Sequence, residues 1–235
     1  MREAVAHFWR TRSAQAKRQG VGTGRRDAGA RRAVTGGAQM DGFVRLVTGV
    51  LTAAGVPEDA IHAKRRVELP GWFRAEKSWD LVVVLDGCLV AAIEFKSQVG
   101  PSFGNNYNNR TEEALGNATD LWASFREGAF APSARPWLGF LMLLEDAPGS
   151  GRAVAPSEPH FPVFEEFRGA SYARRYEILL TKLLRDRLYD GASLILSPER
   201  AGRVGEYTEP STELTFAAMC ESLVGRAIAA VSRRR

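Results

Sequence analysis

The sequence has few of the residues that build zinc centres or disulfide frameworks. Its 235 residues include two cysteines, Cys88 and Cys220, and three histidines that stand far apart in the chain. Neither cysteine belongs to a Cys-x-x-Cys pair, so no zinc-binding motif and no set of paired cysteines is visible. This use of cysteine is typical of a reducing compartment, and we expect a cytoplasmic setting.

Long apolar runs are also absent from the sequence. The N-terminus carries charged residues without the apolar segment of a signal peptide. No run approaches the length needed to cross a lipid bilayer, so we expect no contact with a membrane. A hydrophobic content of 45% over this length is enough to build one domain with its own core.

Positive charge is concentrated at the two ends of the chain. The formal net charge is +5, while residues 1–38 carry nine Arg or Lys residues against two acidic ones, and the last three residues are arginines. Basic ends suggest a polyanion such as double-stranded DNA, although they could serve solubility alone. We expect residues 1–38 to form a basic helix and a flexible arm, and residues 39–235 to form a single domain with its core at about 72–200.

Apolar periodicity predicts helices alternating with strands. The expected helices cover 2–18, 43–54, a segment starting near 109 or 111, 172–184 and 216–227. The expected strands are 81–85 and 89–95, joined as a hairpin around Asp86-Gly87, then 137–144 and 192–196. Residues 100–109 and 145–162 are predicted to be irregular. This order predicts an α/β fold with a central mixed sheet flanked by helices.

Two carboxylates and one amine stand at the ends of the predicted hairpin. Asp80 precedes its first strand, and Glu94 and Lys96 end its second. Carboxylate oxygens suit a hard cation such as Mg²⁺, and a nearby lysine can orient a water molecule for attack on a phosphodiester. The alternative interpretation is that these are charged strand ends reaching for solvent.

The register of the hairpin decides whether these side chains can meet. If Asp86 and Gly87 form a two-residue turn, Asp80 and Glu94 point to opposite faces of the sheet, because side chains alternate along a strand. If the loop has three residues and a bulge, the two carboxylates become diagonal neighbours on one face, roughly 7–8 Å apart. A shared cation therefore predicts a three-residue loop, Leu85–Gly87, with Lys96 on the same face.

The segment that follows the predicted strand is rich in side chains that can read DNA bases. Asn and Gln can form two hydrogen bonds with adenine, and Arg can do the same with guanine. Asn also favours turns and helix caps, and Asn109 in particular could cap the next helix. The candidate DNA-binding residues are Gln98, Asn105, Asn106, Asn108, Asn109 and Arg110.

The spacing of Asp80, Glu94 and Lys96 resembles the PD-(D/E)xK nuclease motif, with Trp79 replacing the usual proline. The longer run between Glu76 and about Phe130, including KSWDLVVV, AAIEFKSQVGPSFGNNYNNRTEEALGNATDLW and REGAF, resembles the XhoI family of type II restriction endonucleases. The resemblance covers little of the basic stretch 17–38.

The resemblance implies a restriction-endonuclease-like fold and an Mg²⁺-dependent homodimer that cuts both strands of palindromic DNA. The implied target is CTCGAG, cut after the first C to leave a 5′ overhang with 5′-phosphates. Asp80, Glu94 and the Phe95 carbonyl would hold the metal, and Lys96 would position the water. A cognate DNA methyltransferase would act on the same site in a bacterial cytoplasm without being a physical partner.

Three other functions fit the same residues. The chain could be a repair nuclease or junction resolvase of this fold that recognises DNA structure rather than sequence. It could also be a non-catalytic DNA-binding protein on the same fold, or an α/β domain with no role in nucleic-acid binding. Glu76, Gln98 and Glu112 are further candidate helpers near the three principal residues.

Overall fold

The structure is a computed structural model that describes residues 1–20 and 37–233. A five-stranded sheet lies at its centre, in the order β1 (Ile61–Ala63), β4 (Leu81–Leu85), β5 (Cys88–Gln98), β6 (Trp137–Glu145) and β7 (Gly191–Ser197). The first two pairs of neighbours are antiparallel and the last two are parallel. The predicted mixed sheet is therefore confirmed.

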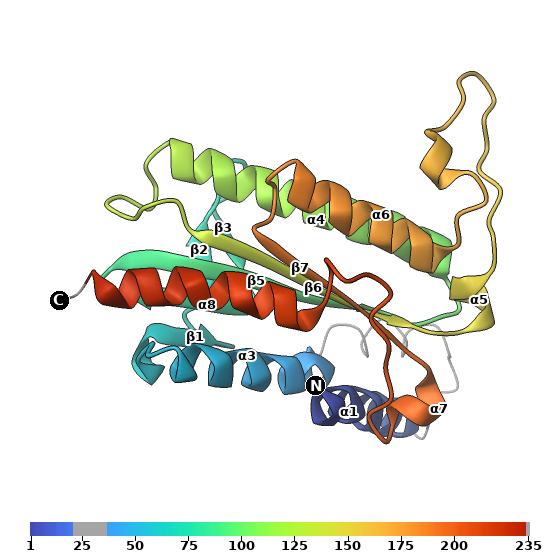
Figure 1. The fold of residues 1–235 in the computed structure, drawn as a ribbon, viewed down its shortest axis with the longest axis horizontal. Coiled ribbons are helices and arrows are strands. Elements are labelled where there is room, and N and C mark those ends of the chain that lie inside the picture. The colour runs from blue at the N-terminus through green and yellow to red at the C-terminus, as the bar shows by residue number, and fades with distance from the viewer. Residues whose placement is uncertain (21–36, 234–235) are drawn as a thin grey trace.

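Helices cover both faces of this sheet (Figure 1). One face is covered by α1 (Arg2–Gly20), α3 (Asp41–Ala53) and α8 (Phe216–Ser232), and the other by α4 (Phe103–Arg126) and α6 (Tyr172–Arg185). The shorter helical segments are η1 (Ala38–Met40), η2 (Glu58–Ala60), α5 (Pro148–Gly151), η3 (Glu165–Phe167) and α7 (Glu199–Gly202). No helix in the described ranges is long and apolar enough to span a bilayer.

Two hydrophobic cores form because successive side chains of a strand point to opposite faces. Leu81, Val83 and Ile93 pack toward α3 and α8, whereas Val82 and Ala92 pack toward α4 and α6. Strands β6 and β7 are buried on both faces, which explains their almost continuous apolar sequences.

Helix α1 packs against α3 and contributes to the first core. Its side chains Phe8 and Trp9 are almost completely buried, and the Trp9 indole N–H donates to Ser197 Oγ at 2.9 Å. The helix predicted over residues 2–18 is thus present, and it is part of the packed structure. The rest of the predicted flexible arm lies almost entirely outside the described residues.

Helix α4 begins at Phe103, so the prediction of a loop over residues 100–109 is wrong after its first three residues. Asn109 lies in the second turn of the helix and does not cap it. The reason is tertiary packing: Phe103 stacks on Tyr172, and Tyr107 meets Tyr176 edge to face, with ring centroids 6.2 and 5.1 Å apart. These aromatic contacts outweigh the weak preference of asparagine for turns.

The hairpin between β4 and β5 differs from both registers considered above. Leu85 pairs with Cys88, so the predicted three-residue loop is wrong, and Asp86 and Gly87 form a two-residue turn with φ of 51° and 76°. These are left-handed conformations, as in the mirror-image turns that match strand twist.

An additional residue inside β5 restores the register that a shared site needs. The pairing shifts between Val83 and Val84, and Val90 is the extra residue on the β5 side, because Val83 pairs with Ala91 whereas Val84 pairs with Leu89. Such a bulge turns every later side chain of β5 to the other face. Asp80 and Glu94 therefore end on the same face of the sheet, although the turn has only two residues.

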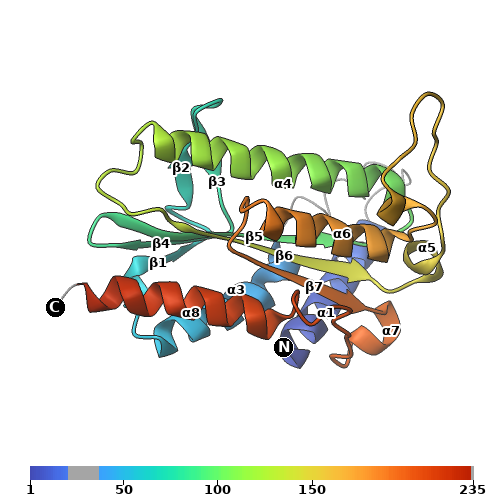
Figure 2. The ribbon, with the colours of Figure 1, turned by 45° about the horizontal axis from the view of Figure 1, so that its top comes forward.

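A second, two-stranded sheet stands beside α4 (Figure 2). It is a hairpin of β2 (Glu68–Pro70) and β3 (Glu76–Ser78), which are antiparallel. Neither strand was predicted, because each has three residues and carries little apolar alternation. This hairpin has consequences for the site, since β3 leads directly into the residues around Asp80.

Candidate active site

The three principal residues meet on the face of the sheet that α4 and α6 cover. Glu94 is almost completely buried in β5, with the Lys96 ammonium nitrogen 2.6 Å from its Oε2. Asp80 lies just before β4, and its Oδ2 accepts a hydrogen bond from the Phe95 N–H at 2.7 Å. The structure thus brings together the residues that the spacing singled out.

A second lysine, which sequence reasoning missed, contacts the same glutamate. Lys77 in β3 donates to Glu94 Oε1 and to the Ser78 carbonyl, the latter at 2.9 Å. Its ammonium also lies 4.4 Å from the centre of the Trp79 ring. Lys77 precedes Asp80 by three residues, but only the fold of the unpredicted hairpin shows that its side chain reaches Glu94.

Helix α4 closes the other side of this cluster. Glu113 lies 3.9 Å from the Lys96 ammonium and accepts a hydrogen bond from Arg110. Glu112, predicted as a helper, is exposed on the same helix, and Glu76 is exposed on β3. The acidic residue that α4 directs toward Lys96 is therefore Glu113 rather than its neighbour.

Burial and neighbouring charges set different protonation behaviour for the two carboxylates. Burial, together with the nearby Glu94 carboxylate, raises the pKa of Asp80 to about 6. Burial alone would raise the pKa of Glu94 as well, but the ammonium groups of Lys96 and Lys77 hold it below its ordinary value. Burial opposes the charge of Lys96, yet the Glu94 carboxylate raises the pKa of this lysine. Glu94 and Lys96 are thus a charged pair at neutral pH.

Among the described residues, the cluster offers oxygen ligands for one hard cation but not a complete set of protein ligands for a metal. No group of three or more His, Cys, Asp or Glu side chains with metal-binding geometry occurs in residues 1–20 and 37–233. Asp80 and Glu94 nevertheless share a face, and Glu94 Oε2 is buried without a hydrogen bond of acceptable geometry, although the Lys96 ammonium is close in distance. Two neighbouring carboxylates, one of them buried, supply oxygen ligands of the kind that a divalent cation prefers.

Gln98 lies inside the protein, unlike the other candidate DNA-binding residues. Its amide nitrogen donates to the Phe103 carbonyl at 2.8 Å, and its oxygen accepts from the Tyr176 hydroxyl. Both ends of the side chain are therefore used to connect β5, α4 and α6. In this conformation both polar ends of Gln98 are engaged within the protein, and its side chain connects β5 to the start of α4.

The asparagines lie on the first two turns of α4. Asn105, Asn108 and Asn109 are exposed, whereas Asn106 and Arg110 are half-buried.

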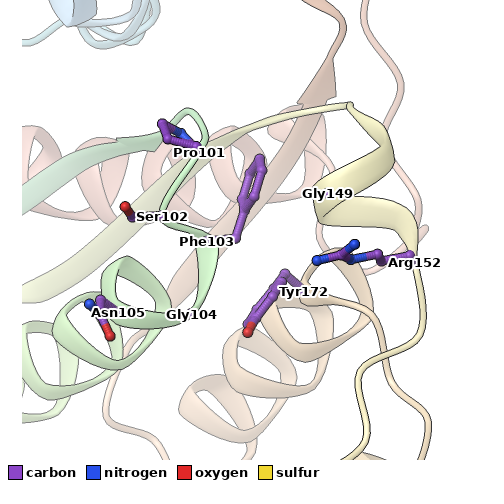
Figure 3. Close-up of a pocket in the computed structure, with 8 residues that line it drawn as sticks. All are labelled: Pro101, Ser102, Phe103, Gly104, Asn105, Gly149, Arg152 and Tyr172. Carbon is purple, nitrogen blue, oxygen red and sulfur yellow. The ribbon is translucent and has the colours of Figure 1, made fainter.

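A pocket lies beside the start of this helix (Figure 3). Its lining residues are Pro101, Ser102, Phe103, Gly104, Asn105, Gly149, Arg152 and Tyr172. Because α4 follows β5 closely, one helix carries both Glu113, near Lys96, and these exposed amides.

The chain is similar in sequence to known restriction enzymes over most of its length. The family described as restriction endonuclease XhoI matches residues 18–209, a range that includes the basic stretch for which the motifs showed little likeness. No solved structure matches the chain significantly.

Three curated proteins illustrate this similarity. The type II restriction enzyme BstVI of Geobacillus stearothermophilus is 48% identical over 204 residues, which cover 85% of this chain and 91% of that protein. The type II restriction enzyme XhoI of Xanthomonas vasicola is 46% identical over 78% of this chain and 73% of its own length. The type II restriction enzyme AbrI of Azospirillum brasilense is 53% identical over 68% of this chain and 72% of its own length. With its mixed sheet, its Asp–Glu–Lys cluster and these relatives, the chain belongs to the XhoI family of type II restriction endonucleases.

Proposed function

We propose that this enzyme cuts both strands of duplex DNA at CTCGAG, after the first C, with Mg²⁺ as cofactor. The products would carry 5′-phosphates on 5′ overhangs. The observation that supports the chemistry is the meeting of Asp80, Glu94 and Lys96 on one face of the sheet. The target sequence is supported by the membership of the XhoI family rather than by any contact in the structure.

The proposed metal ligands are the carboxylates of Asp80 and Glu94 and the carbonyl of Phe95. The Phe95 N–H already bonds Asp80, so the backbone of this residue lies next to the first carboxylate. A bound divalent cation would polarise the scissile phosphate and lower the pKa of a coordinated water. The two carboxylates supply the negative charge and the oxygen atoms that such an ion prefers.

Lys96 would position the attacking water. It lies two residues beyond Glu94, on the same face, and its ammonium is held by Glu94 and Glu113. A charged lysine in this place can orient a water or hydroxide by hydrogen bonding and can stabilise negative charge on the phosphate. Lys77 reaches Glu94 from a different element and is a second candidate for contact with the phosphate.

The proposed DNA-reading residues are those of α4 that face solvent. Asn105, Asn108 and Asn109 have exposed amide groups, and Asn106 and Arg110 are half-buried on the same two turns. Arg110 would have to share or exchange its bond to Glu113 in order to read a guanine. Gln98 is better assigned to supporting this helix.

A palindromic target suggests a homodimer, because two-fold symmetry in the protein would match two-fold symmetry in the DNA. A DNA methyltransferase acting on the same site would protect the host without binding this protein. We further propose that the enzyme acts in the cytoplasm of a bacterium, where the host DNA lies.

Digestion of a sequenced plasmid with a single CTCGAG site tests the function directly. We expect one linear product with Mg²⁺, none with EDTA, and none from a matched plasmid in which the site is changed by one base pair. Sequencing the ends locates the cut. Nicking, or cutting of branched DNA alone, would favour a structure-specific nuclease, and no Mg²⁺-stimulated cleavage under any condition would favour a non-catalytic DNA-binding protein.

A further inference from the structure

The turn of the β2–β3 hairpin, residues 71–75, exposes two large aromatic side chains. We call this turn the aromatic tip. Trp72 is 55% exposed and Phe73 is 72% exposed, whereas the other four tryptophans of the chain are at most 8% exposed. A contiguous exposed apolar patch, here two adjacent aromatic side chains, is a feature of interaction sites.

The aromatic tip is held in place by a buried carboxylate on α4. Asp120 Oδ1 accepts hydrogen bonds from the N–H groups of Trp72 and Phe73, at 2.8 and 2.9 Å. Its other oxygen accepts from Arg74 Nε at 2.7 Å, and Arg74 also donates to Asn117. Asp120 is only 4% exposed, so its carboxylate is buried, and the hydrogen bonds from the turn compensate for the loss of water.

Gly71 shows how closely the turn approaches α4. A Cβ atom at this position would lie 2.7 Å from Asp120 Oδ2, which is too close for any side chain. The turn is therefore packed closely against α4 in the absence of a partner. A preorganised surface loses little conformational entropy on binding, which favours a role in recognition.

The aromatic tip lies within reach of DNA held at the candidate active site. The same hairpin carries Lys77, whose ammonium contacts Glu94. Phe73 precedes Lys77 by four residues, so the backbones of the two residues are at most about 14 Å apart, the length of four fully extended residues. This upper limit corresponds to about four base pairs of duplex at 3.4 Å each. Figure 2 shows the hairpin rising beside the C-terminal half of α4, whose N-terminal turns carry the proposed reading residues.

We propose that the aromatic tip is a DNA-contacting surface, with Trp72 and Phe73 packing against sugars and base edges in a groove to one side of the scissile phosphate. This inference rests on duplex DNA being the substrate. Apolar side chains inserted in this way occur in proteins that bind the minor groove. Arg74 is paired with Asp120 and keeps 42% of its side chain exposed, so the guanidinium N–H groups not used in that pair are available to a phosphate.

A second copy of the chain is a poorer partner for this surface. Two aromatic side chains bury at most about 300–500 Å² together, whereas a stable interface buries about 800 Å² on each partner. Apart from these two side chains, the turn is a glycine, an alanine and an arginine held by α4. The area is sufficient for a groove contact and insufficient for a dimer.

Acrylamide quenching of tryptophan fluorescence tests the inference, because Trp72 is the exposed tryptophan. The difference between the wild-type protein and Trp72→Phe isolates its signal. We expect Trp72 to be readily quenched in the free protein and protected by a CTCGAG duplex in the presence of EDTA, with binding verified by the anisotropy of a labelled duplex. Unchanged quenching in the bound complex would overturn the proposal. Protection already present in the free protein, together with a dimer in sedimentation, would assign the surface to a second copy instead.

A double variant, Trp72→Ala with Phe73→Ala, gives an independent measurement. We expect the affinity for the duplex to fall about tenfold to a hundredfold, the range expected when a few apolar contacts are lost. The slope of log affinity against log salt should stay the same, because no phosphate contact is removed. The matched control is Phe161→Ala, an 84% exposed phenylalanine between α5 and α6, which should leave affinity unchanged. Unaltered affinity in the folded double variant, or a shallower salt slope, would contradict the assignment, whereas the plasmid digestion above reports on the endonuclease activity itself.

Discussion

The two faces of strand β5 are both buried, but one face is apolar and the other carries charged side chains. Ala91, Ile93 and Phe95 point toward α3 and α8 and make only apolar contacts, whereas Glu94 and Lys96 point toward α4 and carry charge. The residues alternate one by one along a single strand. The comparison shows that burial by itself does not distinguish a residue of the apolar core from a residue of the candidate site.

The difference lies in what each face contributes to the free energy of folding. Apolar side chains stabilise the protein by about 25 cal/mol for each Å² removed from water. A buried ion pair contributes little, because desolvation offsets the attraction between the charges. A cluster such as Glu94, Lys96 and Lys77 therefore adds little to stability, which agrees with the catalytic role proposed above.

The largest expected effect comes from removing the central carboxylate. Glu94→Gln keeps the size of the side chain but removes the charge that Lys96, Lys77 and the proposed metal share. We expect the rate of CTCGAG cleavage to fall at least about a thousandfold, equal to about 4 kcal/mol of barrier. Initial rates on a plasmid with one site measure this effect. Normal cleavage by the folded Glu94→Gln variant would contradict the assignment of the active site.

A nearly equal loss of cleavage is expected from Lys96→Met. The substitution keeps the apolar stem and removes the ammonium that would position water, so the cleavage rate should fall about a hundredfold to a thousandfold. Duplex affinity should change by less than about threefold, since the charge acts mainly in the transition state. Fluorescence anisotropy and single-turnover cleavage separate the two quantities. Equal losses in both would make Lys96 a phosphate contact instead.

Asp80→Asn should stabilise the metal-free protein while it removes activity. Because the pKa of Asp80 is raised to about 6 in the folded state, folded protein holds this proton more tightly than unfolded protein does. The stability linked to that proton is fully present below about pH 4, the ordinary pKa of an aspartate, and is lost as pH rises through the folded pKa. Asparagine does not titrate, so the variant should be more stable at pH 8 by about 1–3 kcal/mol.

Urea unfolding in EDTA at pH 8 and pH 5 measures this difference. The advantage of the Asp80→Asn variant over the wild type should shrink by about half at pH 5, where Asp80 is mostly protonated in the folded protein. An advantage that does not change between the two pH values would show that the carboxylate is not destabilised by its surroundings.

Lys77→Met separates the two lysines that share Glu94. Lys77 comes from the hairpin and competes for the carboxylate that would bind Mg²⁺. We expect the dissociation constant for Mg²⁺, measured by calorimetry without DNA, to decrease about threefold to tenfold, since removing a nearby positive charge favours a cation. Lys96→Met, measured alongside, shows whether both lysines act alike. Weaker metal binding by the Lys77→Met variant would mean that this lysine holds Glu94 in position for the ion.

The smallest effect is expected on the apolar face. Ile93→Val removes one methylene from a fully buried side chain next to Glu94 in sequence, and it should lower the free energy of unfolding by about 0.5–1.5 kcal/mol. Cleavage of the plasmid should be unchanged at a temperature where the variant is folded. A loss of activity larger than the loss of stability would show that the two faces of β5 are not independent.

Much of the fold was predictable from local patterns. The helices over residues 2–18 and 172–184, the hairpin strands and strands β6 and β7 follow from apolar periodicity and were predicted close to their positions. The start of α4 was not, because its stability comes from Phe103 and Tyr107 packing on residues far along the chain, Tyr172 and Tyr176. Local preferences contain no information about such contacts.

Part of the candidate site could also be predicted from the sequence. The spacing of Asp80, Glu94 and Lys96 pointed to their joint chemistry, because that chemistry lies in the residue types themselves: oxygen ligands for a cation and an amine for water. Lys77, Glu113 and Asp120 could not be recognised in the same way. Each acts on a residue from another element, and only folding places the two side chains together.

The amino-acid sequence by itself determined the two apolar runs, the position of the hairpin at Asp86-Gly87 and the kinds of chemical groups available, because these depend on neighbouring residues. The tertiary structure alone decided that these groups meet. A bulge at Val90 compensates for a two-residue turn and returns Glu94 to the face of Asp80. The physical reason is that strand register depends on how the whole sheet pairs and packs, and a shift of one residue exchanges its two faces.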